Sequence, residues 1–324
     1  MIDTAHLNTP ASFEPFVLSG AMLARLAENM AYPLTQDQLL FGIRAGKLLE
    51  GDYGQWLTDA VIAEQLLDGE QLGCLLGIWN RQTHKIALFP ASTVPHRAWQ
   101  QKQIEMPEKK IANCLGSGLY HYKVGAHEPE GRPFEEGAFR LTREQPAFAW
   151  RFYTPYHRFS LENGMPTLSV VNDHIHSAQS TTQIGGISFS SAGCQVIEGD
   201  HTPPAAPTGF YQTFRILAGQ SAQPSPLEIA TPYQYLLTHA RHLELIAAGE
   251  NSLRLLQGSR GMNVRLLQEA LMQRGFLDEN MIDKGTFNGY TAEALYRYQK
   301  EAGLRADGIA TLKDLKMLGV TPIC

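Results

Sequence analysis

The sequence lacks any dense run of lysine or arginine. Its 324 residues include 27 Lys and Arg against 32 Asp and Glu, and the formal net charge is -5. A protein that neutralises many phosphates needs a basic patch, so we expect no nucleic acid as a partner. Long apolar runs are also missing, because the stretch at residues 16–26 is too short to cross a bilayer. We therefore expect no membrane span.

Cysteine is scarce and scattered. The four cysteines show no CxxC spacing, which disfavours a zinc ribbon or a dense disulfide framework. They are Cys74, Cys114, Cys194 and Cys324. We interpret them as separate thiols, and a disulfide between Cys74 and Cys114 stays open, since sequence separation does not fix the distance between Cα atoms.

The first residues, MIDTAHLNTPASFEPF, carry no basic segment and include an early Asp and a proline. This pattern is not that of a secretory signal peptide. We expect a protein made in the cytoplasm, which reaches any site outside it by a route other than general secretion.

Length and patterning predict an α+β protein with an appended module. Apolar residues recur at helical spacing in residues 15–50 and 56–72, which predicts a helical N-terminal subdomain over residues 1–76. From Gly77, short β-type runs between Gly, Pro and Asn predict a mostly β domain over residues 77–250. The runs include residues 78–80, 85–89, 120–124, 139–141, 169–171 and 210–216, and a helix is expected at residues 233–248.

The C-terminal region, residues 251–324, has the pattern of a three-helix bundle. Val264, Leu267 and Leu271 share one face of a first helix, and Gly275 lies where its C-terminal cap is expected. Thr291 is a candidate N-cap of a second helix. A third helix carries Leu312, Leu315 and Leu318, and Gly-containing turns at residues 283–288 and 306–309 separate the three.

These elements resemble the type 1 peptidoglycan-binding domain. The resemblance runs from residue 253 to 318 and includes Gly275-Phe276, Asp283 with Phe287, and Asp307-Gly308, with an insertion at Lys284-Gly285. It implies that peptidoglycan is a partner, bound through glycan or stem peptide. Members of the family also serve as spacers or docking modules, and a generic helical bundle is the alternative.

The central domain holds a candidate nucleophile, Cys194, and a candidate base, His176. A thiol attacks as thiolate, so it needs an imidazole that takes its proton. The small residues Ala192 and Gly193 leave room for a carbonyl substrate, and nearby backbone N–H groups could form an oxyanion hole. A lone cysteine is otherwise often a small buried hydrophobe.

The order of these residues resembles the active-site motif of the L,D-transpeptidase (YkuD-type) family, over residues 77–216. The resemblance implies Cys194 as nucleophile, His176 as base, and Ser191 and Gly193 as the Ser and Gly of the motif. We expect Tyr120, Arg140 and His174 to bind substrate. Ser177, Ala192 and Val196 depart from the family's Gly, His and Arg, so Arg140 or Arg44 would have to replace the missing guanidinium.

A metal site is the alternative chemistry. His174 and His176 alternate on one strand and, with Asp173, could bind zinc as in a metallopeptidase. No HExxH motif supports it, and we expect neither metal nor cofactor. His127, His157 and His201 are interpreted as ordinary histidines, and Trp56, Trp79, Trp99 and Trp150 as core or cleft aromatics.

Both resemblances indicate one substrate. We expect Cys194 to attack a carbonyl of the tetrapeptide stem, expel a D-amino acid and form a thioester. Water would then give an L,D-carboxypeptidase, and an amine would give a transpeptidase or an amino-acid exchanger. The expected context is an antibacterial type VI secretion effector in the periplasm of a target cell, with secretion machinery and an immunity protein as partners. A phage lysis enzyme, a zinc-dependent murein peptidase and an inactive murein-binding adaptor are the alternatives.

Overall fold

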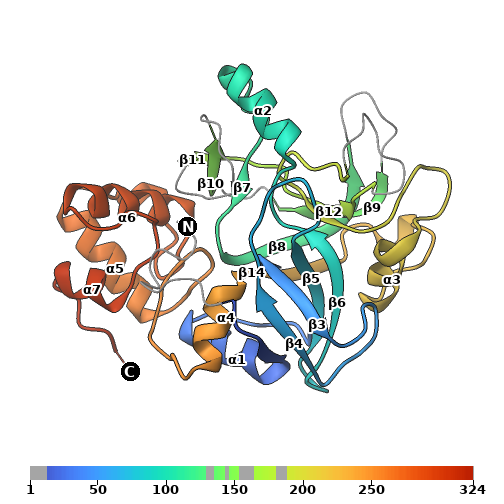
Figure 1. Cartoon of the computed structure of the whole chain (residues 1–324). Helices are drawn as coiled ribbons and strands as arrows, with labels where there is room; N and C mark the ends of the chain where they lie inside the picture. The colour runs from blue at the N-terminus through green and yellow to red at the C-terminus, as the bar shows by residue number, and fades with distance from the viewer. Residues whose placement is uncertain (1–12, 129–134, 143–145, 153–163, 180–187, 324) are drawn as a thin grey trace.

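The computed structural model describes residues 13–128, 135–142, 146–152, 164–179 and 188–323. Within them the chain is an α+β protein, as expected, and its centre is a closed eight-stranded barrel (Figure 1). All neighbouring strands are antiparallel except β12 with β13 and β2 with β14. In order around the barrel the strands are β12 (Ile175–Ser177), β13 (Gln195–Ile197), β6 (Lys85–Ser92), β5 (Cys74–Asn80), β2 (Gln38–Arg44), β14 (Pro232–His239), β8 (Gly118–His127) and β9 (Glu135–Leu141).

In the described ranges, two three-stranded sheets and four helices surround the barrel. One sheet has the order β1 (Phe16–Ser19), β4 (Asp59–Glu64) and β3 (Gly46–Glu50). The other has the order β11 (Gly164–Ser169), β10 (Ala147–Phe152) and β7 (Cys114–Leu115). The helices are α1 (Gly20–Asn29), α2 (Arg97–Glu105), α3 (Gly209–Leu217) and α4 (Ala240–Ala247).

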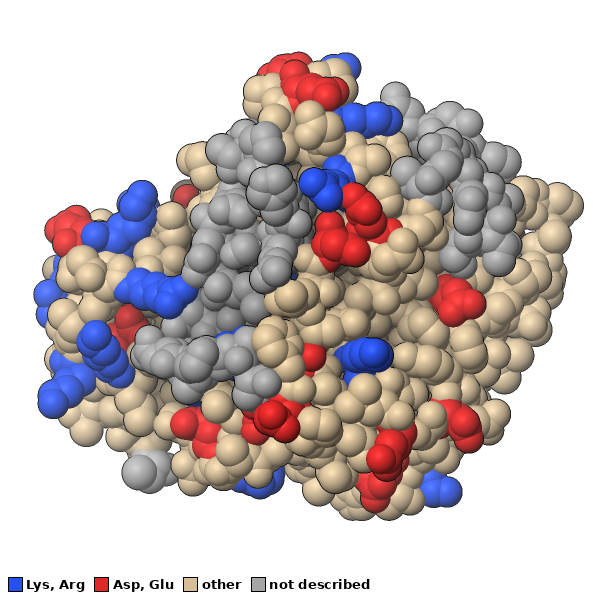
Figure 2. Space-filling model, in the orientation of Figure 1, with Lys and Arg blue, Asp and Glu red and all other residues tan. Residues whose placement is uncertain are grey.

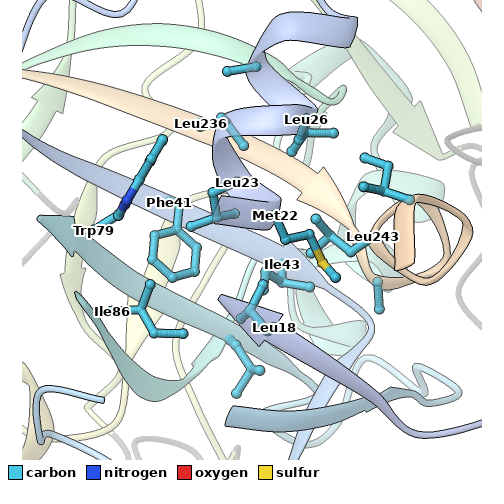
Figure 3. Packing of buried hydrophobic residues seen from close by; sticks show 14 of the residues in the cluster. Leu18, Met22, Leu23, Leu26, Phe41, Ile43, Trp79, Ile86, Leu236 and Leu243 are labelled. Carbon is cyan, nitrogen blue, oxygen red and sulfur yellow. The ribbon is translucent and has the colours of Figure 1, made fainter. Parts of the chain in front are cut away.

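Several barrel strands are buried on both faces. In β2, Leu40 packs in the cluster that fills the barrel, whereas Phe41 and Ile43 pack outside it against Leu23 and Leu26 of α1 (Figure 3). A strand covered on both sides loses the alternation of apolar and polar residues and becomes a nearly continuous apolar run.

The predicted helical N-terminal subdomain is therefore wrong beyond α1. Residues 38–64 form β2, β3 and β4 instead of helices. Strand β2 pairs with β5 and β14, which follow it in the chain. The predicted boundary at residue 76 therefore falls inside the barrel, within β5. Two further predictions fail in the same way: residues 210–216 lie in α3, and residues 233–239 belong to β14, so the expected helix begins only at α4.

The C-terminal region contains α5 (Met262–Gln273), α6 (Gly289–Glu301) and α7 (Leu312–Met317). Gly275 follows α5 with φ +77, a left-handed conformation that favours glycine after a helix. Asn288, not Thr291, is the N-cap of α6, and its side chain accepts a hydrogen bond from the Thr291 N–H at 3.0 Å. We call residues 260–318, which hold these helices, the C-terminal module.

The sheet of β7, β10 and β11 lies between the barrel and the C-terminal module. Phe148 and Trp150 of β10 pack in one hydrophobic cluster with Val264, Leu267 and Leu295 of the module. The alternate residues of the same strand, Ala147 and Ala149, pack in the barrel's cluster. Tyr296 of α6 completes the contact, with its ring centroid 5.8 Å from Phe148 and 6.1 Å from Trp150. The module thus shares a core with the rest of the molecule.

Cys74, Cys114 and Cys194 are free thiols, so the disulfide left open by the sequence does not form. In the described residues, no helix has both the length and the apolar composition needed to span a bilayer. Residues 1–12, on which the signal-peptide prediction depends in part, and His157 lie outside the described residues.

Candidate active site

Two adjacent parallel strands bring Cys194 and His176 together. Cys194 directly precedes β13, and His176 lies in β12 opposite Val196. Parallel neighbours lie about 4.8 Å apart, so the two side chains meet at one end of the strand pair. The Cys194 Sγ and a ring nitrogen of His176 lie within 4.8 Å of each other, and a nitrogen of His127 lies within the same distance of both.

His176 is held in one orientation by a backbone carbonyl. Its Nδ1 lies 2.7 Å from the carbonyl oxygen of Ser177, and Oε2 of the buried Glu135 lies 3.6 Å from the same nitrogen. Both neighbours are acceptors, so we assign the proton to Nδ1. The other nitrogen, Nε2, then keeps its lone pair and can act as a base.

The Cys194 thiol is protonated in the resting site. The Cys194 Sγ donates a hydrogen bond to the carbonyl oxygen of Asn172 at 3.2 Å, and the residue is only 8% exposed. Burial, followed by the charge of Asp173, raises the pKa of this thiol well above its ordinary value. The site therefore holds a neutral thiol beside an imidazole and not a preformed thiolate.

Ser191 and Gly193 shape the loop before Cys194. Ser191 Oγ donates to the Cys194 carbonyl oxygen at 2.7 Å and accepts from the Gly193 N–H at 3.1 Å. Gly193 has φ +148, and a Cβ there would lie 2.7 Å from both Asn113 Nδ2 and Asp173 Oδ1. Only glycine fits this position. Because Ser191 already engages the Gly193 N–H, that group is not free to stabilise an oxyanion in this conformation.

Asp173 is a buried carboxyl next to this loop. Its Oδ1 accepts a hydrogen bond from Asn113 Nδ2 at 2.5 Å, and its Oδ2 has no hydrogen-bond partner in the described part of the chain. Burial raises the pKa of Asp173 to about 7, against the opposing effects of Asn113, Arg151 and Arg44. The carboxyl group is therefore half protonated near neutral pH.

Cys194 and His176 lie in a cleft of about 750 Å³, a volume typical of ligand sites. Lysines 102, 109 and 110 and Arg151 line it together with Glu128, Glu135 and Asp173, so its walls carry charge of both signs. On the face drawn in Figure 2, blue and red side chains likewise lie side by side below α2. The cleft is suited to a ligand that carries both carboxylates and amines.

The predicted substrate-binding residues do not line this cleft. Tyr120 Oη donates to the Gly116 carbonyl oxygen at 2.9 Å and faces the module. His174 is buried, and its Nδ1 accepts from the Leu141 N–H at 3.2 Å. Arg140 lies 3.6 Å from Glu128, at the rim. Arg44 is buried and donates to the Leu115 carbonyl oxygen at 2.7 Å, so neither predicted arginine lines the cleft, whereas Arg151 does.

Two residues of this site were missed by sequence reasoning. His127 was interpreted as an ordinary histidine, but its ring stacks on His176 with centroids 4.1 Å apart and planes 10° apart. Glu135 lies directly opposite His127 in the hairpin of β8 and β9. The sequence predicted strands only at residues 120–124 and 139–141, which stop short of both residues. Extending these two strands and pairing them antiparallel is the signal that would have found His127 and Glu135.

The metal alternative was predicted for Asp173, His174 and His176. In the described ranges the gathered set of three candidate ligands is instead His127, His176 and Cys194. An imidazole binds a metal in the plane of its own ring, and two nearly parallel stacked rings cannot both aim at one ion. This arrangement would have to open before a metal could bind all three.

Residues 260–318 match the family model described as a putative peptidoglycan binding domain. No curated protein and no solved structure is significantly similar to the chain. The resemblance of residues 77–216 to L,D-transpeptidases therefore stays a prediction. The C-terminal module, with α5, α6 and α7, is a domain of the peptidoglycan-binding family.

Proposed function

We propose that this protein is a peptidoglycan-modifying cysteine enzyme that acts on stem peptides. The observation that carries the proposal is the placement of Cys194 beside His176, whose Nδ1 is held by the Ser177 carbonyl oxygen, in a charged cleft. A second, independent support is the peptidoglycan-binding module in the same chain. That module implies association with the cell wall.

The proposed reaction begins with proton transfer. Nε2 of His176 accepts the Cys194 Sγ proton while the sulfur attacks the carbonyl carbon of the residue before a D-amino acid. The C–N bond breaks, the imidazolium donates its proton to the leaving amine, and a thioester remains on Cys194. Water then releases the acid as an L,D-carboxypeptidase would, or an amine acceptor forms a new amide.

The electrostatics of the cleft favour this order of events. A thiol with a raised pKa gives little thiolate before substrate binds, so deprotonation and attack are expected to be coupled. Lys109, Lys110 and Arg151 give the cleft a cationic side. Stem peptides carry carboxylates, and this side would attract them.

The test is the incubation of stem peptides and sacculi with the wild type and with Cys194→Ala, followed by mass analysis of the products. We expect the wild type alone to release a D-amino acid or exchange it. Cys114→Ala is the matched control, because Cys114 is also buried but does not line the cleft. An active Cys194→Ala variant would refute the proposal.

A zinc-dependent peptidase is the second candidate, because His127, His176 and Cys194 are gathered within 4.8 Å of one another, although the stacked rings would have to separate before all three could bind one ion. A chelator that abolishes activity, with recovery on adding zinc, would support it. If no product forms under any condition while sacculi still bind, the adaptor alternative holds.

The effector context stays a proposal of the same kind. Expression directed to the periplasm of a susceptible bacterium should lyse or deform the cells, whereas Cys194→Ala should not. Protection by a neighbouring immunity gene would favour the secreted effector, and a neighbouring holin gene would favour the phage enzyme.

A further inference from the structure

A second hollow, of about 210 Å³, lies between the barrel and the C-terminal module. We call it the boundary groove. Its barrel side includes Leu119 and His121, and its module side includes Arg260, Asp283 and Phe287. Chain segments far apart in the sequence thus form one surface.

The boundary groove continues into the candidate active site. Val170 and Val171 line both the groove and the cleft of Cys194. The next residue, Asn172, accepts the hydrogen bond of the Cys194 thiol. A ligand that extends from the cleft over Val170, which is 56% exposed, therefore enters the groove.

The two walls of the groove are fixed relative to each other. Gly289, the first residue of α6, packs so closely that a Cβ would lie 2.3 Å from the Pro146 carbonyl oxygen. A Cβ at Gly308 would lie 2.9 Å from the Phe148 ring. The Leu119 N–H also donates to the Gln257 carbonyl oxygen at 2.9 Å. The groove is therefore preformed, which lowers the entropic cost of binding.

The groove carries one cation and one anion on its module side. Arg260 and Asp283 are both exposed, and neither forms an ion pair with the described residues. Their segments are adjacent, because the Gly261 N–H donates to the Gly285 carbonyl oxygen at 2.9 Å. On the visible face of the module, Lys and Arg side chains also predominate (Figure 2). Unpaired charges of both signs suit a zwitterionic peptide better than an uncharged glycan.

We propose that the boundary groove binds a second peptide of the substrate, the one cross-linked to the stem peptide whose bond Cys194 attacks. Arg260 binds a carboxylate of this peptide and Asp283 binds an amine. The inference rests on the proposed function, and it assigns cross-linked rather than monomeric stem peptides as the preferred substrate class.

The test compares a cross-linked dimeric muropeptide with the monomeric muropeptide. Removing one charge-assisted contact is expected to raise KM about tenfold. We expect Arg260→Ala and Asp283→Asn to raise KM for the dimer by this factor, with kcat unchanged and the monomer unaffected. Arg260→Lys should recover part of the loss. Arg265→Ala is the matched control, because Arg265 lies exposed on α5 and pairs with Glu269 at 2.9 Å, outside the groove.

Binding measured by calorimetry in the Cys194→Ala background separates this inference from the proposed function. There the dimer should bind more tightly than the monomer, and Arg260→Ala should abolish the difference, whether or not the wild type shows activity. Equal binding of monomer and dimer would overturn the inference. So would an effect of Arg260→Ala that appears with the sugars present and vanishes when the same dimeric peptide lacks them, since the groove would then bind glycan.

Discussion

The imidazole of His127 lies parallel to that of His176, with the ring centroids 4.1 Å apart and the planes inclined by 10°. His127 ends β8, and Glu135, its partner in the neighbouring strand β9, lies with Oε2 3.6 Å from Nδ1 of His176. The candidate base is thus held by a stacked ring, a carboxylate and the Ser177 carbonyl oxygen.

His127 should act by positioning His176. His127→Ala removes the stacked ring and is expected to lower kcat about tenfold, because a misplaced base transfers the proton less efficiently. His127→Phe keeps a flat ring and should retain most of the activity. Steady-state kinetics on a stem peptide distinguishes the two variants. Equal loss in both would point to a chemical role of the His127 nitrogens, including metal binding.

Cys194 should react slowly with iodoacetamide at neutral pH. Its pKa is raised by burial, so the thiolate fraction is small at pH 7 and keeps growing as the pH rises beyond 9. Peptide mass mapping after timed alkylation measures this profile. A rate that is already constant from pH 7 to 9 would instead reveal a preformed thiolate and imidazolium pair.

Asp173 should make stability depend on pH. Its pKa in the folded protein, about 7, lies above its ordinary value of 3.8. The folded state then binds the proton more tightly, so the contribution of Asp173 to stability is full below pH 4 and falls as the pH rises to about 7. At about 1.4 kcal/mol for each pKa unit, the change is on the order of 4 kcal/mol.

The measurement is the difference in the free energy of unfolding between the wild type and Asp173→Asn at several pH values. The asparagine keeps an acceptor for Asn113 but does not titrate. Relative to this variant, the wild type should lose stability between pH 4 and 7 and change little above that. A constant difference would show that the carboxyl group titrates normally.

Gly193→Ala should abolish the proposed activity without unfolding the protein. The added Cβ would meet Asn113 and Asp173 at 2.7 Å and displace the loop that carries Cys194, with an expected loss of about a hundredfold or more. Gly249→Ala is the control, because Gly249 also has a positive φ, +98, but nothing lies within 4 Å of its added Cβ. Activity and thermal unfolding are compared. Similar activity in both variants would contradict the tight fit at Gly193.

Tyr296→Ala should weaken both stability and activity. The ring packs on Phe148 and Trp150 of β10, and we expect a cost of about 2 kcal/mol. Strand β11 pairs with β10 and leads directly into Val170 and Asn172 of the cleft, so activity on small soluble stem peptides should fall as well. If only binding to sacculi fell, the module would be acting as a separate anchor.

Local signals predicted part of the molecule well. Cys194 and His176 are close in sequence, and their proximity was predicted from an expected strand end, loop and second strand. The Gly-containing turns of the module also depend on local sequence. Gly275 and Gly308 adopt positive φ angles, which glycine favours, so the residue type alone predicts a turn there. Each of these features depends on a few neighbouring residues.

The failures arose where distant contacts decide the outcome. Leu39, Leu40 and Ile43 were interpreted as positions of a helix, because β2, in which they lie, is covered on one face by α1 and on the other by the barrel core. Tyr120 and His174 were assigned from a resemblance, whereas their hydrogen bonds to Gly116 and Leu141 turn them away from the cleft. Arg151 reaches the cleft through the pairing of β10 with β7 and β11, which no local pattern encodes.

The core shared by β10 and the module also limits how the protein can travel. A binding module on a flexible linker lets an enzyme reach many bonds while the module stays bound at one position. Here Phe148 and Trp150 pack the module against the sheet beside the cleft, with no flexible linker between them. Each bound position on peptidoglycan would therefore present bonds at one fixed distance from the module. Reaching the next bond would require the whole molecule to dissociate and bind again.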